Sequence, residues 1–259
     1  MEEISEIASG KLSFGSEFAG LLNDVLRQKS AFIHGIFDNA QVGRQIAMML
    51  LAVLVLSGAY GLAMGAPGGW RQMFSSGLKV PALLLLTLAI CFPVLFVVNV
   101  LMGSKLGILQ TLALIMFALT LNSIMLASFA PVAAFFGFSG SDYHFMKLLH
   151  VVVFAFCGAW GMIALWHGMA EVCDKTSLYP PQGMRILRIW ILVFGFVGTQ
   201  MAWTLRPYIG APELPFEMFR KNNLGKNFYT ATWYSVSKLF HGESATISAP
   251  MPAVKAEAK

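Results

Sequence analysis

Residues 79–102 read Lys79-Val-Pro-Ala-Leu-Leu-Leu-Leu-Thr-Leu-Ala-Ile-Cys-Phe-Pro-Val-Leu-Phe-Val-Val-Asn-Val-Leu-Met102, an apolar run whose only charged residue stands at its start. As an α-helix rising about 1.5 Å per residue, this run would extend for roughly 36 Å. The hydrocarbon core of a bilayer is about 30 Å thick, so the run predicts a membrane-spanning helix. Pro93 lacks a backbone donor and predicts a kink, which makes it a candidate hinge.

The composition of the whole chain agrees with a membrane protein. Of its 259 residues, 57% are hydrophobic and only 12% are charged, whereas a soluble domain carries about 25% charged residues. The apolar runs lack the alternating pattern of outer-membrane strands, so helices are the way to satisfy their backbone in lipid. We therefore predict an all-α, polytopic membrane helical bundle.

Five spans are predicted within residues 44–208, at about 44–65, 78–102, 106–138, 145–169 and 184–205. Residues 66–70, with Pro and Gly, predict a turn. The third run is longer than one crossing needs, so it either tilts or breaks at Pro131, a second candidate hinge. Residues 209–241 predict a connector followed by an amphipathic helix, and the composition of residues 242–259 is typical of a disordered tail.

Residues 1–43 form an amphipathic N-terminal segment. Its apolar residues recur at helical spacing, first around Phe18 to Leu26 and again around Phe32 to Phe37. Such a helix either lies on the membrane surface or packs on the protein itself, and the pattern leaves both interpretations open.

Helix packing is predicted at two kinds of residue. Ser57, Gly61 and Gly65 recur every fourth position, which lets another helix approach closely, either within the chain or from another molecule. Asn99 and Asn122 lie inside apolar runs. Because an amide in hydrocarbon is costly unless it is hydrogen-bonded, both are expected to face a neighbouring helix.

The residues that usually carry chemistry do not form a recognisable motif. His150 and His167 do not share a helix face, and Cys91, Cys157 and Cys173 show no metal-binding spacing. Glu171 and Asp174 are interpreted as solvated residues at a helix end. The sequence thus predicts no metal, no cofactor and no catalytic residue. For this protein to be an enzyme, the extension after the fifth span would have to close a pocket around Trp203, Arg206 and Tyr208.

The segment after the fifth span combines basic and aromatic residues and predicts an interface with the membrane surface or with a partner protein. The candidate interface residues are Arg206, Arg220, Lys221, Lys226, Tyr229, Trp233 and Phe240.

Residues 44–170 contain several short motifs, namely Gly61-Leu-Ala-Met-Gly65, the run from Lys79, Cys91-Phe-Pro-Val-Leu-Phe-Val-Val-Asn99, Gly103, Gln110 and Ala130-Pro131. With these motifs the chain resembles bacterial membrane proteins of the Yip1-like (Yip1 domain) family. The resemblance implies a five-helix bundle with a cytoplasmic N-terminal segment and a non-enzymatic scaffold role. The extension after Arg206 departs from this pattern and suggests a dedicated partner.

Taken together, the residues and the resemblance lead us to expect a non-enzymatic scaffold or assembly subunit of a bacterial inner (cytoplasmic) membrane. Its partners would be the lipid bilayer and either further copies of itself or other membrane proteins, not nucleic acid. The alternative is a channel or transporter subunit with a polar path near Asn99 and Asn122. Basic residues are shared about evenly between the two sides, so the positive-inside rule does not choose an orientation.

Overall fold

The computed structural model of the protein describes residues 2–27, 32–33, 35–36, 41–140, 142–175, 181–209 and 228–241. In these ranges the chain is helical and contains no strand. The α-helices are α1 (Glu2–Arg27), α3 (Val42–Gly65), α4 (Trp70–Leu101), α5 (Ile108–Phe138), α6 (Tyr143–Lys175), α7 (Pro181–Thr204) and α8 (Phe228–His241), and a short 3-10 helix covers Ala66–Gly68. The predicted all-α class is confirmed.

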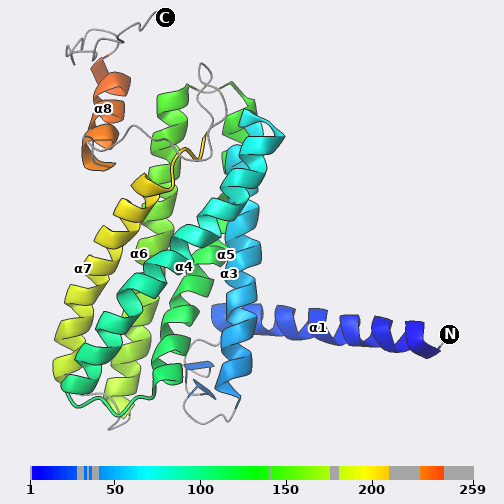
Figure 1. The fold of residues 1–259 in the computed structure, drawn as a ribbon, viewed down its shortest axis with the longest axis vertical. Coiled ribbons are helices and arrows are strands. Elements are labelled where there is room, and N and C mark those ends of the chain that lie inside the picture. Colours follow the sequence, from blue (N-terminus) through cyan, green and yellow to red (C-terminus); the bar gives the residue numbers. More distant parts are fainter. Residues whose placement is uncertain are drawn as a thin grey trace, which may run out of the picture.

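Helices α3 to α7 form a bundle of elongated helices that lie side by side (Figure 1). Each of the five contains a segment long and apolar enough to cross a membrane. The chain is therefore a multi-pass α-helical membrane protein, as its composition predicted.

Helix α5 forms the centre of the bundle. Within its most apolar segment 67% of the residues are buried, against 17% in α7. Every residue from Ala113 to Ser123 is buried. A helix that is apolar on all sides suits a position in the interior of the bundle, and α3 and α6 pack against it.

Helix α4 begins earlier than predicted. The chain turns at Ala66–Gly68 and at Gly69, whose φ of 88° suits glycine. Helix α4 then starts at Trp70 and not near residue 78. The sequence misled because the first two turns of α4 carry polar residues, including Gln72 and Ser76, which hydropathy places outside a span. Both are buried in the fold.

The prolines do not interrupt their helices. Helix α4 continues through Pro93, and α5 runs unbroken through Pro131 to Phe138. The expected alternative of a break at Pro131 is therefore wrong, and a hinge at either proline stays a prediction.

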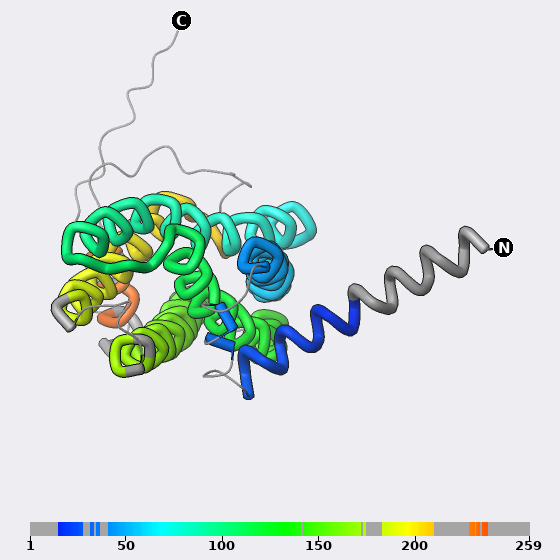
Figure 2. Tube along the Cα trace, turned by 90° about the horizontal axis from the view of Figure 1, so that it is seen from below, coloured from blue at the N-terminus to red at the C-terminus, as the bar shows by residue number. Residues whose placement is uncertain are grey.

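The two flanking helices lie at opposite ends of the bundle. Helix α1 lies crosswise to the bundle in Figure 1, and Figure 2, a view along the bundle, shows the C-terminal part of α1 beside it. Its contacts are with α3 and α5, where Val25 is fully buried. Helix α8 packs on α6 and α7 at the other end. Residues 242–259, predicted as a tail, lie outside the described residues.

Candidate functional site

The end of the bundle where α7 finishes carries a polar network that we call the polar cap, made by Gln72, Ser76, Lys79, Pro207 and Tyr208. The Gln72 side-chain amide donates to the Tyr208 carbonyl at 2.6 Å and to the Pro207 carbonyl at 3.2 Å. The Lys79 ammonium donates to the Pro207 carbonyl at 3.0 Å, and the Ser76 hydroxyl donates to the Tyr208 carbonyl.

The spacing within α4 explains this network. Positions 72, 76 and 79 lie on one helix face, and that face meets the segment that follows α7. Carbonyls beyond a helix end have no intrahelical donor and need another one when they are buried. The polar cap thus anchors the start of the extension to α4, which hydropathy alone did not reveal.

Arg206, a predicted interface residue, is not a free surface group. Its guanidinium lies 3.1 Å from the centroid of the Trp203 ring, and two of its nitrogens are buried. The Tyr208 hydroxyl is also buried, and burial raises its pKa above the ordinary value. Trp203 and Arg206 therefore pack together, and the buried polar groups of this segment are the Arg206 guanidinium and the Tyr208 hydroxyl.

Helix α8 is held on the bundle by its buried Ser235. The Lys147 ammonium donates to the Ser235 hydroxyl at 3.0 Å, and the ring of His144 lies within 3.3 Å of the same oxygen. Tyr229 and Trp233, two predicted interface residues, are 52% and 74% exposed. Tyr229 nevertheless belongs to the docked side, because its ring stacks on Phe196 of α7 and its hydroxyl lies 3.2 Å from that of Thr199. Trp233 is the predicted interface residue that α8 leaves exposed.

The remaining predicted interface residues cannot be placed. Arg220, Lys221 and Lys226 lie outside the described residues, as does the side chain of Phe240.

The small-residue face predicted on α3 packs within the chain. A Cβ on Gly61 would lie 2.4 Å from the Ser76 carbonyl oxygen, and one on Gly65 would lie 2.6 Å from that of Gln72. Ser57 is buried and bonds to the Val53 carbonyl of its own helix. This face is therefore occupied by α4.

The two predicted packing amides are both buried. Asn122 faces α6, where a Cβ on Gly161 would lie 3.2 Å from the Cβ of Asn122. Asn99 lies near the end of α4, on the buried side of that helix. Asn122 lies near the middle of α5, whereas Asn99 lies two residues before the end of α4.

A buried pair escaped the sequence reasoning. The Tyr60 hydroxyl of α3 lies 2.7 Å from Nδ1 of His150 in α6. The other ring nitrogen of His150 is buried and has no hydrogen-bond partner in the described part of the chain. A tyrosine in one span and a histidine in another were the available signal, but nothing in their spacing pairs them.

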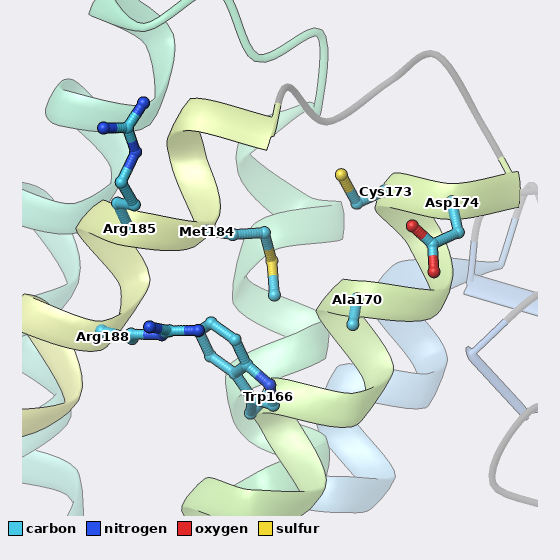
Figure 3. A pocket seen from close by; sticks show the side chains of 7 residues that line it. All are labelled: Trp166, Ala170, Cys173, Asp174, Met184, Arg185 and Arg188. Atoms are coloured by element: carbon cyan, nitrogen blue, oxygen red, sulfur yellow. The ribbon is translucent and has the colours of Figure 1, made fainter.

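A second candidate site is a pocket of about 330 Å³ between α6 and α7, at the end opposite the polar cap (Figure 3). We call it the α6–α7 pocket. Its lining residues are Trp166, Ala170, Cys173, Asp174, Met184, Arg185 and Arg188. The Arg188 guanidinium lies 4.6 Å from the centroid of the Trp166 ring. Asp174, interpreted from sequence as a solvated residue, is exposed as expected and also lines this pocket.

Residues 32, 33 and 36, which lie between α1 and α3, pack near the end of the bundle that carries the α6–α7 pocket. The side chains of Ile33 and Ile36 are buried, Ile33 packs against Gly168 of α6, and Phe32 stacks on Phe117 of α5. The apolar residues Phe32, Ile33 and Ile36 therefore pack on the protein's own helices. Among the described residues, no group of three His, Cys, Asp or Glu side chains is arranged to hold a metal ion.

Comparisons with known proteins add no relative. No protein-family model matches the chain, and neither a curated protein nor a solved structure shows significant similarity to it. The fold and its sites therefore define the class, a multi-pass α-helical membrane protein, and nothing narrower.

Proposed function

We propose that the chain is a non-enzymatic membrane scaffold or assembly subunit of a bacterial inner membrane, of the Yip1-like kind that its motifs resemble. In this proposal α1 and the exposed face of α8 contact other membrane proteins or further copies of the chain. The observation that carries the proposal is the placement of α1 outside the bundle.

Helix α1 spans 26 residues, and among its described side chains, those of residues 15–27, only Val25 is buried in the bundle. Its ion pair with the bundle, Glu17 to Arg44 at 2.5 Å, is exposed and contributes little, roughly 0–1 kcal/mol. Most helical stability in proteins comes from covering an apolar face. A helix that its own bundle covers so little is suited to bind a surface, either the bilayer or a partner.

The polar groups inside the spans favour this role over a channel. The hydroxyls of Thr87, Thr120 and Ser123 each donate to a carbonyl of their own helix, four residues earlier, at 2.7–2.8 Å. All three side chains are buried inside the bundle, and because their donors are satisfied within their own helices they do not require water. The small-residue face is also occupied within the chain, so self-association would use other surfaces.

The test compares two charge-matched double variants of full-length protein. Phe18→Glu/Leu22→Glu places two carboxylates among the half-buried apolar residues of α1, while Ala19→Glu/Asn23→Glu places them on exposed positions. We expect chemical cross-linking in native membranes and light scattering after extraction to show an assembly that only the first variant loses. A wild-type protein that is monomeric and cross-links to nothing would refute the proposal.

A channel or transporter subunit is the alternative, and one observation favours it: the Asn122 amide oxygen is buried without a hydrogen-bond partner in the described residues. Solute flux into liposomes that contain the protein, abolished by Asn122→Leu, would support this alternative against the scaffold role.

A further inference from the structure

The α6–α7 pocket combines cationic, aromatic and apolar side chains. Two guanidinium groups, Arg185 and Arg188, and one carboxylate, Asp174, line it, which amounts to one net positive charge. In the described part of the chain neither arginine has a carboxylate partner. Arg188 extends over the Trp166 ring, and Arg185 points away from Trp166 (Figure 3). Both arginines are exposed, so their guanidiniums keep donors available for an added anion.

The pocket lies where the membrane helices end. The apolar segment of α6 ends at Glu171, and that of α7 begins at Gly183. Trp166 and Arg188 contact each other roughly one and a half turns from the ends of these segments, a depth at which tryptophan and arginine meet lipid headgroups. An anion that reaches this pocket from the bilayer would be a headgroup.

The surface one turn deeper is apolar and uncovered. Ile163 precedes Trp166 by one helical turn, and Leu192 follows Arg188 by one turn, so each lies on the same helix face as its neighbour. Their side chains are 49% and 74% exposed. The site therefore presents cations at headgroup depth and an apolar track at acyl-chain depth.

From this arrangement we propose that the α6–α7 pocket binds an anionic phospholipid, with its phosphodiester at Arg185 and Arg188 and an acyl chain along Ile163 and Leu192. A guanidinium binds phosphate oxygens through two parallel hydrogen bonds. A phosphodiester carries one negative charge, which matches the net charge of the pocket. Trp166 holds the Arg188 side chain in place by cation–π attraction. This site does not depend on the scaffold role.

The test uses full-length protein in detergent, titrated with phosphatidylglycerol, phosphatidylcholine or inorganic phosphate. Bound lipid is counted by native mass spectrometry, and affinity is followed by the shift in unfolding temperature. We expect phosphatidylglycerol to bind more tightly than phosphatidylcholine, and inorganic phosphate to have little effect. If inorganic phosphate shifts the unfolding temperature as much as phosphatidylglycerol does, the ligand is a soluble phosphate and the lipid site is refuted.

Variants separate the pocket from general surface charge. Arg185→Gln/Arg188→Gln should weaken phosphatidylglycerol binding roughly 30-fold, about fivefold for each cation at a membrane surface. The matched control is Arg71→Gln, because Arg71 is also an arginine beside a tryptophan, 5.3 Å from the Trp70 ring at the other end of the bundle. Equal losses in the two variants would overturn the proposal.

A third variant, expected to tighten lipid binding, keeps the proposal testable if the double substitution prevents folding. Asp174→Asn removes the one carboxylate among the described lining residues of the pocket and should tighten phosphatidylglycerol binding several-fold. Unchanged or weaker binding by this variant would contradict the assignment.

Discussion

The contact between α3 and α4 makes Gly61→Ala a sharp test of the fold. An added Cβ would lie 2.4 Å from the Ser76 carbonyl oxygen, 2.9 Å from the Ser76 carbonyl carbon and 3.0 Å from the Gly77 Cα. All three atoms belong to the α4 backbone, so no side-chain rotation can relieve the clash. To make room, α3 and α4 would have to move apart along their whole close contact, which also includes Gly65.

The size of the effect follows from two opposed terms. Overpacking a well-packed interface costs typically about 1–3 kcal/mol, and alanine in place of glycine returns roughly 1 kcal/mol through helix propensity. Because the clash is with backbone, we expect a value at the upper end and a net loss of about 1–2 kcal/mol.

Gly195→Ala in α7 is the matched control for the Gly61 variant. Its added Cβ would meet nothing within 4 Å, so only the propensity term applies and this variant should be unchanged or slightly more stable. The free energy of unfolding would be measured by denaturation in mixed micelles of detergent and lipid. If Gly61→Ala proves as stable as Gly195→Ala, the close approach of α3 and α4 is refuted.

Other contacts give smaller tests of the same kind. Trp190→Phe removes the hydrogen bond from the indole nitrogen to the Cys91 carbonyl at 2.9 Å and should lower the unfolding free energy by about 1 kcal/mol, as measured in the same micelles. His150→Phe strands the buried Tyr60 hydroxyl and should cost about 1–3 kcal/mol, while Tyr60→Phe/His150→Phe should cost less than the sum of the single changes. Burial raises the pKa of Tyr208, so this group stays neutral in the fold above its ordinary value of about 10 while it ionises in the unfolded chain. Stability should therefore fall as the pH rises through 10, and Tyr208→Phe should reduce that fall in pH-dependent unfolding.

The sequence was sufficient for the class of fold and for the existence of its spans. Runs such as 79–102 are long and apolar, and in a bilayer an uninterrupted helix is the only local solution for their backbone. This information is local, since each run carries its own length and hydropathy. The spans could therefore be predicted without knowing their neighbours, although α4 starts, and α6 ends, several residues from the predicted positions.

The partners of each helix face were decided only by the tertiary structure. The glycines of α3 predicted a close contact, but helical spacing does not say whether the contact is with α4 or with another molecule. In the same way, nothing in the sequence predicts that Arg188 contacts Trp166 or that Tyr60 contacts His150. Residues far apart in the chain meet only when the order, tilt and rotation of the helices are set. Packing between helices, a non-local property, therefore determined the polar cap and the α6–α7 pocket.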